Sequence, residues 1–192
     1  MTSLRHIPKP DGYLDAARAA ILDLGWRRTT LTEVARRAGV SRMTIYRTWP
    51  DMTSLLADLM TREWGRVVAG TAAASGDATV AAIADRVIRT VHALREDELF
   101  TRIVELDPEL LLPYLLSRRG RSQDAVLDAI TEGIREGQAA GEIRAGRPLV
   151  MARALVLALH GFVISAHTMV DDEVSEQDLD AELRELVGKV LR

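Results

Sequence analysis

The chain has no cysteine among its 192 residues, and aromatic residues make up only 4% of it. The lack of cysteine excludes a disulfide framework and thiolate chemistry. With two phenylalanines, three tyrosines and three tryptophans, the chain has little material for stacking a large aromatic ligand. Aliphatic or mixed ligands therefore fit the composition better than large stacked ones do.

The motifs of common enzymes and metal sites are also missing. The sequence contains no glycine-rich phosphate loop, no G-x-S-x-G and no H-E-x-x-H. The four histidines are scattered, and His160 and His167 lie two helical turns apart, too far to share one metal ion. We therefore predict no enzymatic activity, no bound metal and no cofactor.

No alternating apolar and polar pattern of useful length is present, and there is no internal repeat. Helical periodicity dominates instead, which predicts an all-α chain that is long enough to bury a core in one or two domains. The N-terminus lacks the charged-then-apolar leader of a secreted protein, so we expect a cytoplasmic location.

The charge is distributed unevenly along the chain. Residues 1–50 hold nine Lys and Arg against four Asp and Glu, whereas residues 51–192 hold 16 against 24. The overall net charge of −3 does not suggest nucleic acid, but a basic N-terminal part does. The leader 1–10, with Arg5, His6 and Lys9, is a candidate basic arm for phosphates or the minor groove. The alternative is a terminus that contacts nothing.

Residues 29–56 read TTLTEVARRAGVSRMTIYRTWPDMTSLL and predict two short helices joined by a tight turn. Thr30 and Ser41 are suitable N-caps, and Gly39 tolerates the positive φ that such a turn requires. The inward positions are taken by Leu31, Val34, Ala35, Ala38, Ile45 and Trp49. This combination of caps, glycine and spacing is typical of a helix-turn-helix.

The second helix of such a motif enters the major groove with its N-terminal end. Arg42 can pair with a guanine edge, and Met43 or Thr44 can contact a thymine methyl group. Candidates for phosphate contacts, which position the protein without reading sequence, are Thr30, Tyr46, Arg47 and Thr48. The alternative is a helical hairpin without a DNA role, in which Arg36 and Arg37 form a solvated face.

Over about residues 11–60 these features resemble a TetR-type transcriptional regulator in order and spacing. A helix over 11–26 with Gly25 as its end signal precedes the motif, and the paired leucines of a further helix follow it. The resemblance implies a three-helix DNA-binding head, with the DNA-contact roles falling on the residues named above. The chain departs from the family's usual pattern at Met43, Thr48 and Met52, where the family has a small residue, an aromatic or histidine, and a lysine.

The resemblance further implies that the head, residues 1–50, is followed by a helical ligand-binding and dimerisation domain, residues 51–192. Periodicity predicts the helices of that domain over 51–72, 79–94, 98–106, 109–116, 122–140, 149–170 and 175–191.

The segment 149–170 is the most apolar and is long enough to span a bilayer. Arg153, His160 and His167 lie within it and would be costly in hydrocarbon, so we predict no membrane span. We expect it to pair with 175–191 and to form a four-helix interface with a second copy. Small residues that would allow close approach are Ala152, Ala154, Ala158, Gly161 and Ala166. Two-fold symmetry would place two recognition helices about 34 Å apart on a roughly palindromic operator.

A small-molecule effector is implied by the same resemblance. The residues expected to line its pocket are Trp64, Val68, Val91, Phe100, Ile103, Tyr114 and Phe162, with His92, Tyr114 and His160 as polar contacts; plain core residues are the alternative. We expect a homodimeric repressor that the effector releases from double-stranded DNA. Two alternatives stay open: an activator or ligand-independent regulator of the same fold, or a helical interaction module without DNA binding.

Overall fold

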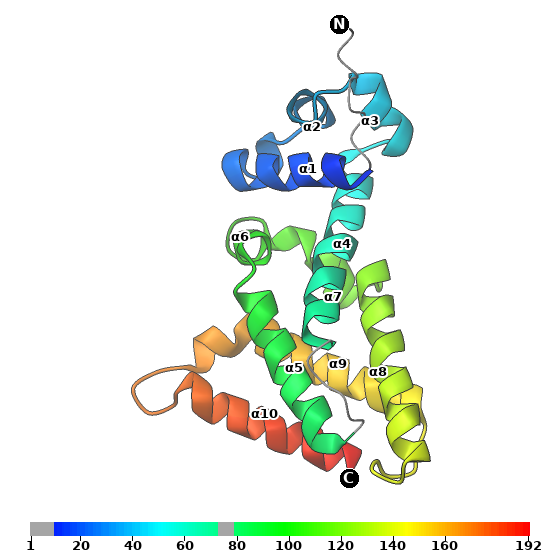
Figure 1. Cartoon of the computed structure of the whole chain (residues 1–192). Helices are drawn as coiled ribbons and strands as arrows, with labels where there is room; N and C mark the ends of the chain where they lie inside the picture. Colours follow the sequence, from blue (N-terminus) through cyan, green and yellow to red (C-terminus); the bar gives the residue numbers. More distant parts are fainter. Residues whose placement is uncertain (1–9, 73–78) are drawn as a thin grey trace, which may run out of the picture. The chain divides into compact units, whose positions relative to one another are not determined.

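The computed structural model describes residues 10–72 and 79–192. Within these ranges every regular element is a helix (Figure 1), which confirms the predicted all-α class. The candidate basic arm with Arg5, His6 and Lys9 lies outside the described residues, as do residues 73–78 between the helices predicted over 51–72 and 79–94.

The chain forms two compact units. Residues up to 63 group with 98–120, and residues 64–97 group with 121–192. The segment 98–120 and the beginning of the helix after Asp51 therefore belong with the helix-turn-helix. The predicted functional division at residue 50 stays a prediction, because compactness does not assign function.

The first unit contains α1 (Pro10–Leu24), the 3-10 turn η1 (Trp26–Arg28), α2 (Leu31–Arg37), α3 (Arg42–Thr48) and the first part of α4 (Met52–Ala72). It also contains α6 (Glu98–Leu106), the 3-10 turn η2 (Pro108–Leu110) and α7 (Leu112–Leu116). Helices α1, α2 and α3 are called the head below. Buried apolar side chains of this unit include Leu14, Ala17, Ile21, Val34, Ile45, Leu55, Leu59, Leu99 and Ile103.

The single helix predicted over 109–116 is wrong in detail, because the structure has η2 followed by α7 there. Pro113 has no N–H to give to the carbonyl of Glu109, and its ring would clash with that carbonyl in a continuous helix. The chain instead turns at Leu111, whose N–H donates to the carbonyl of Pro108 at 3.0 Å.

The second unit contains the rest of α4, α5 (Val80–Arg95), α8 (Arg121–Ala139), α9 (Pro148–Ser165), the 3-10 turn η3 (Ala166–Met169) and α10 (Glu176–Leu191). Its core is aliphatic and includes Ile83, Val87, Val91, Leu127, Ile134, Leu155, Leu183 and Val187. Helix α10 lies alongside α5 (Figure 1). Polar pairs join the two helices: His92 with Asp180, Arg95 with Glu176, and Arg184 with Asp85.

The apolar helix α9 ends earlier than predicted. A single helix over 149–170 is wrong, because α9 stops at Ser165 and the chain tightens into η3. The hydroxyl of Thr168 donates to the carbonyl of Ser165 at 2.8 Å, which satisfies one of the backbone acceptors freed at the helix end.

The stretch Pro148–Met169 has a mean hydropathy of 2.0, yet only 22% of it is buried. Its length and composition would allow it to cross a membrane, but this is weak evidence because the core helices of soluble proteins can be equally long and apolar. Its outward side chains include Leu149, Val150 and Leu157. Exposed apolar surface of this kind is typical of an interaction site.

Candidate nucleic-acid interface

The two predicted caps and the predicted turn are present in the structure. The Thr30 hydroxyl accepts the N–H of Glu33 at 3.2 Å, and the Ser41 hydroxyl accepts the N–H of Thr44 at 3.2 Å. Gly39 has φ 68°, in the left-handed region that glycine enters without a steric penalty. The sequence between the helices therefore forms a capped helix-turn-helix.

The end of α3 is anchored by Trp49, which is buried as predicted. Its indole N–H donates to the carboxylate of Asp58 on α4 at 2.7 Å. Its ring also meets the edge of Tyr13 on α1, with 6.3 Å between ring centroids. The orientation of α3 is thus fixed by α1 and α4 together. Sequence reasoning missed Asp58, because nothing local to Trp49 marks a partner nine residues later.

One face of α3 is exposed and is not used in packing. The side chain of Met43 is 69% exposed and that of Tyr46 is 45% exposed. Arg42 and Arg47 are exposed as well, and neither makes a hydrogen bond or ion pair with another described residue. This face thus presents two cations together with an apolar and an aromatic side chain. This face is therefore available to a ligand of complementary charge.

The two threonines of α3 differ from these four side chains. Thr44 is half-buried, and its hydroxyl lies 2.9 Å from that of Ser41. The exposed Thr48 donates its hydroxyl to the carbonyl of Thr44 at 3.3 Å. Both hydroxyls thus make hydrogen bonds within α3 and its N-cap. Their predicted DNA contacts, like those of the other candidates, stay predictions.

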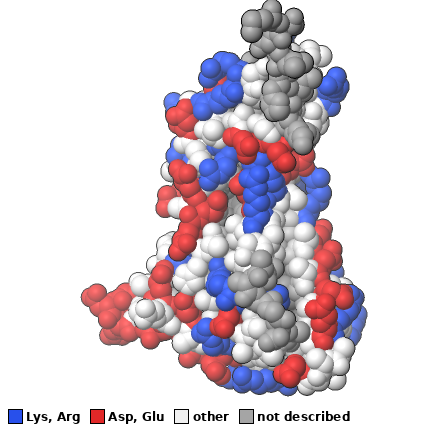
Figure 2. Space-filling model, in the orientation of Figure 1, with Lys and Arg blue, Asp and Glu red and all other residues white. Residues whose placement is uncertain are grey.

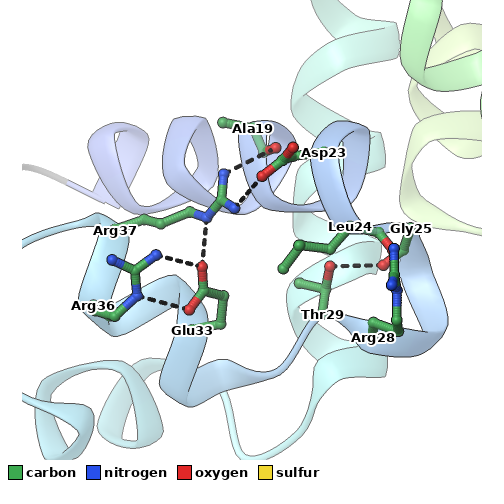
Figure 3. A network of polar contacts seen from close by, with 9 residues as sticks. All are labelled: Ala19, Asp23, Leu24, Gly25, Arg28, Thr29, Glu33, Arg36 and Arg37. Atoms are coloured by element: carbon green, nitrogen blue, oxygen red, sulfur yellow. Dashed lines mark hydrogen bonds and ion pairs between the residues drawn. The ribbon is translucent and has the colours of Figure 1, made fainter.

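A carboxylate organises the arginines of α2 (Figure 3). Glu33 accepts hydrogen bonds from Arg36 at 2.7 and 2.8 Å and from Arg37 at 2.7 Å. Arg37 also donates to Asp23 of α1 at 2.6 Å. The hydrogen bonds from Arg36 and then Arg37 lower the pKa of Glu33 to about 2. Arg37 therefore ties α2 to α1 and is more than a solvated charge.

Two further ionic contacts brace this unit. Arg27 of η1 reaches Glu109 at 2.7 Å and Asp107 at 3.4 Å, which joins the head to the segment around η2. Arg62 of α4 donates to the backbone carbonyl of Asp11 at 2.8 Å and pairs with Asp15. These contacts join α4 to α1, and η1 to the segment that follows α6. Figure 2 shows other Lys and Arg side chains around the helix-turn-helix end of this unit.

The residues predicted to line a ligand pocket divide between the two units. Phe100 and Ile103 are buried and Tyr114 is half-buried in the first unit. The second unit holds buried Val91 and the half-buried side chains of Trp64, Val68, His92, His160 and Phe162. The structure thus does not bring the set together within one unit, and a shared pocket stays a prediction.

The polar members of that set have partners within the chain. His92 Nε2 lies 2.7 Å from the carboxylate of Asp180, which joins α5 to α10. His160 Nε2 lies 3.4 Å from the Gln123 amide, and partial burial lowers the pKa of His160 so that its imidazole is neutral near pH 7. Arg118 stacks over the Tyr114 ring at 5.1 Å. Each contact gives these side chains a structural role.

Comparison with known proteins matches the head to a family model. Residues 14–59 match the model of bacterial regulatory proteins of the tetR family. Over 170 residues the chain is 31% identical to an uncharacterized HTH-type (helix-turn-helix) transcriptional regulator of Mycobacterium bovis, with coverage of 88% of this chain and 87% of the relative.

Solved structures extend the likeness to the whole fold. The transcriptional repressor QsdR of R. erythropolis, from the TetR family, has a TM-score of 0.69 at 16% identity and covers 95% of this chain and 93% of its own. The complex of SmeT with triclosan, from Stenotrophomonas maltophilia, has a TM-score of 0.59 at 23% identity. The match covers 95% of this chain and 91% of the SmeT chain. A head with a helix-turn-helix followed by further helices is common to all of them.

Proposed function

The chain belongs to the TetR family of DNA-binding transcriptional regulators, and on that premise we propose that it is a homodimeric repressor which a small molecule releases from a palindromic operator. The proposal also places it in the cytoplasm, where the operator is, with no membrane partner. The observation that carries it is the face of α3 on which Arg42, Met43, Tyr46 and Arg47 stand exposed.

The chemistry of this face fits a major groove. Arg42 lies in the first turn of α3, the end that approaches base edges in this motif, and a guanidinium matches the two acceptors of guanine. Arg47 lies one turn further on, where a cation suits a phosphate. Neither arginine is committed to a described carboxylate, in contrast to Arg36 and Arg37, which share Glu33. Binding of DNA by the head would therefore not require any ion pair of α3 to be broken.

A selection of genomic fragments with purified protein at physiological salt tests DNA binding directly. We expect recovery of a short palindrome, and an affinity for it that falls steeply as salt rises, because phosphate contacts release counterions. The matched control is Arg42→Ala combined with Arg47→Ala, which leaves every described ion pair intact. No enrichment by the wild-type protein, with or without added metabolites, would overturn the proposal in favour of an interaction module.

Dimerisation through residues 149–191 is supported by the outward face of α9. Leu157 is 72% exposed, and Val150 and Leu149 are 50% and 42% exposed. Ala154, Ala158 and Gly161 lie on the same face and are exposed as well. Small residues between large apolar ones allow two helices to approach closely. Self-association of this face would remove apolar surface from water, and two-fold symmetry would match a palindrome.

A ligand is proposed from the fold and from one relative. The structure of SmeT holds triclosan, and we propose that this chain takes a small, largely apolar molecule among those predicted pocket residues that belong to the second unit: Trp64, Val68, Val91, His92, His160 and Phe162. Helix α4 is the proposed link, since its first part belongs to the unit of the head and its last part to the other unit. The bond from Trp49 to Asp58 joins α3 to that helix.

Coupling has a direct test. The operator recovered from the selection is bound to the protein, and metabolite fractions are screened for release. A ligand acts only through different affinities for two states, so a true effector must bind free protein more tightly than the DNA complex. A molecule that binds the protein tightly and leaves its affinity for the operator unchanged would contradict the proposed coupling. Trp49→Phe, which lacks the indole N–H, should weaken the response to the effector more than it weakens effector binding.

A further inference from the structure

The outward face of α9 carries one cation among its apolar side chains. Arg153 lies three residues after Val150 and four before Leu157, on the same side of the helix, and all three side chains are exposed. Among the described residues Arg153 has no hydrogen-bond or ion-pair partner. If two copies of α9 pack face to face, this guanidinium leaves water, and a buried charge without a partner is costly.

Helix α10 offers an acceptor. Glu182 lies three residues after Leu179 and four before Leu186, so it borders an apolar strip on which Leu186 is 46% exposed. Glu182 is exposed and pairs with no described residue, whereas Glu176 is held by Arg95. Figure 2 shows more acidic side chains at the loop leading into α10, where the sequence has Asp171, Asp172 and Glu173.

Helices α9 and α10 of one unit run in opposite directions. The N–H of Arg144, shortly before α9, donates to the carbonyl of Leu191 at the end of α10 at 2.8 Å. The other ends are joined by η3 and a short loop. The start of α10 therefore lies toward the end of α9 that is far from Arg153. Within one copy Arg153 thus lies in the first half of α9, whereas Glu182 lies near the middle of α10, in the half that runs toward the other end of α9.

A two-fold axis would bring the first half of α9 in one copy toward the first half of α10 in the other. If the exposed faces of α9 from two copies pack together with Leu157 at the two-fold axis, the residue four positions before Leu157 in one copy meets the residue four positions after Leu157 in the other. Arg153 would then approach the partner's Gly161 and, beyond it, the first half of the partner's α10. We propose that Arg153 pairs with the partner's Glu182 across the dimer, once on each side of the axis. The pair sets the register of the helices and restricts the interface to copies of this chain.

This inference rests on the proposed dimer, and charge exchange in the full-length protein tests it. Arg153→Glu alone and Glu182→Arg alone should each weaken self-association by about tenfold or more, since each leaves like charges facing across the interface. Mixing the two variants should give a heterodimer of nearly wild-type affinity. The measurement is sedimentation velocity, with differently tagged copies to identify the heterodimer, and circular dichroism confirms that each variant is folded.

Glu185→Arg is the matched control, because Glu185 is an exposed acid close by on α10 but lies away from the strip of Leu179 and Leu186. It should not rescue Arg153→Glu. Rescue by Glu185→Arg equal to that by Glu182→Arg, or no loss of association in either single variant, would overturn the pairing.

The variant Leu157→Asp distinguishes failure of the proposed ion pair from failure of the proposed dimer interface. If Leu157→Asp abolishes association and Arg153→Glu does not, the interface stands and the ion pair fails. If Leu157→Asp leaves the dimer intact, the interface itself is elsewhere and both proposals fail. Binding of the wild-type protein to anionic lipid vesicles that depends on Leu157, in place of self-association, would equally overturn both.

Discussion

Glu33 accepts a hydrogen bond from Arg37 one turn later on α2, with 2.7 Å between the carboxylate oxygen and Nε. The same guanidinium reaches Asp23 on α1 at 2.6 Å, so one local pair of α2 is extended into a tie between two helices of the head. The head consists of short helices, which are marginal alone and depend on such contacts between helices.

Glu33→Gln should change how stability depends on pH. The pKa of Glu33 is lowered to about 2 by its arginines in the folded protein, while the unfolded carboxyl keeps its ordinary value near 4.5. The stabilisation is therefore complete above the unfolded pKa and is lost as the pH falls from about 4.5 toward about 2. The variant lacks this term, so urea midpoints of wild type and variant should converge in acid.

The matched control for that measurement is Glu132→Gln. Glu132 accepts a single hydrogen bond from Arg135 in an exposed pair, and such pairs contribute little. Its substitution should leave the pH dependence close to that of the wild type. Parallel curves for Glu33→Gln and the wild type down to about pH 3 would contradict the role given to Glu33.

Gly39→Val should destabilise the head through its backbone. A Cβ at Gly39 would meet nothing within 4 Å, so space is available, but φ 68° is unfavourable for a β-branched residue. We expect a loss of about 1–2 kcal/mol or more in the free energy of unfolding. Gly39→Asn should lose less, since asparagine tolerates this region. Thermal denaturation of both variants measures the difference, and equal stability of the valine and asparagine variants would argue against backbone strain as the cause.

Arg42→Ala should relax the sequence preference of DNA binding. If Arg42 reads a guanine, its loss costs about 1–3 kcal/mol at one operator position and little on other sequences. Arg47→Ala is the comparison, and it should weaken binding uniformly and reduce the salt dependence, as expected of a phosphate contact. Binding to a set of single-base operator variants distinguishes the two. A uniform loss for Arg42→Ala would assign it to a phosphate instead.

Met43→Ala should affect DNA binding without affecting folding. The side chain is 69% exposed, so the free energy of unfolding should change by less than about 0.5 kcal/mol. If Met43 covers a thymine methyl, replacing that thymine with uracil should weaken the wild type by about 0.8 kcal/mol. The variant should bind the two operators equally well. Sensitivity to uracil that persists in Met43→Ala would move the contact to Thr44.

The caps and the turn of the helix-turn-helix could be predicted because they depend on residues three or four apart. Thr30, Ser41 and Gly39 act on their own helix ends, so the sequence around each position is enough. The face of α3 follows from the same periodicity once Ile45 and Trp49 are buried. The arginine pairs of Glu33 could have been found by the same spacing rule.

Contacts between distant segments could not be predicted in this way. The bond from Trp49 to Asp58, the tie from Arg27 to Glu109 and the grouping of 98–120 with the head depend on how helices pack. The same holds for the expected pocket, whose residues fall in two units. Helical spacing shows that a residue is buried, but it does not show which residues lie beside it.

By itself the sequence determined that the chain is helical, where the second helix of the helix-turn-helix begins and ends, and that α9 is apolar on nearly every side. Only the tertiary structure decided which side of α9 the protein covers with its own core and which side, with Leu157 and Arg153, stays in water. The physical reason is that hydrophobicity is a property of each side chain, while burial depends on the neighbours that the fold supplies.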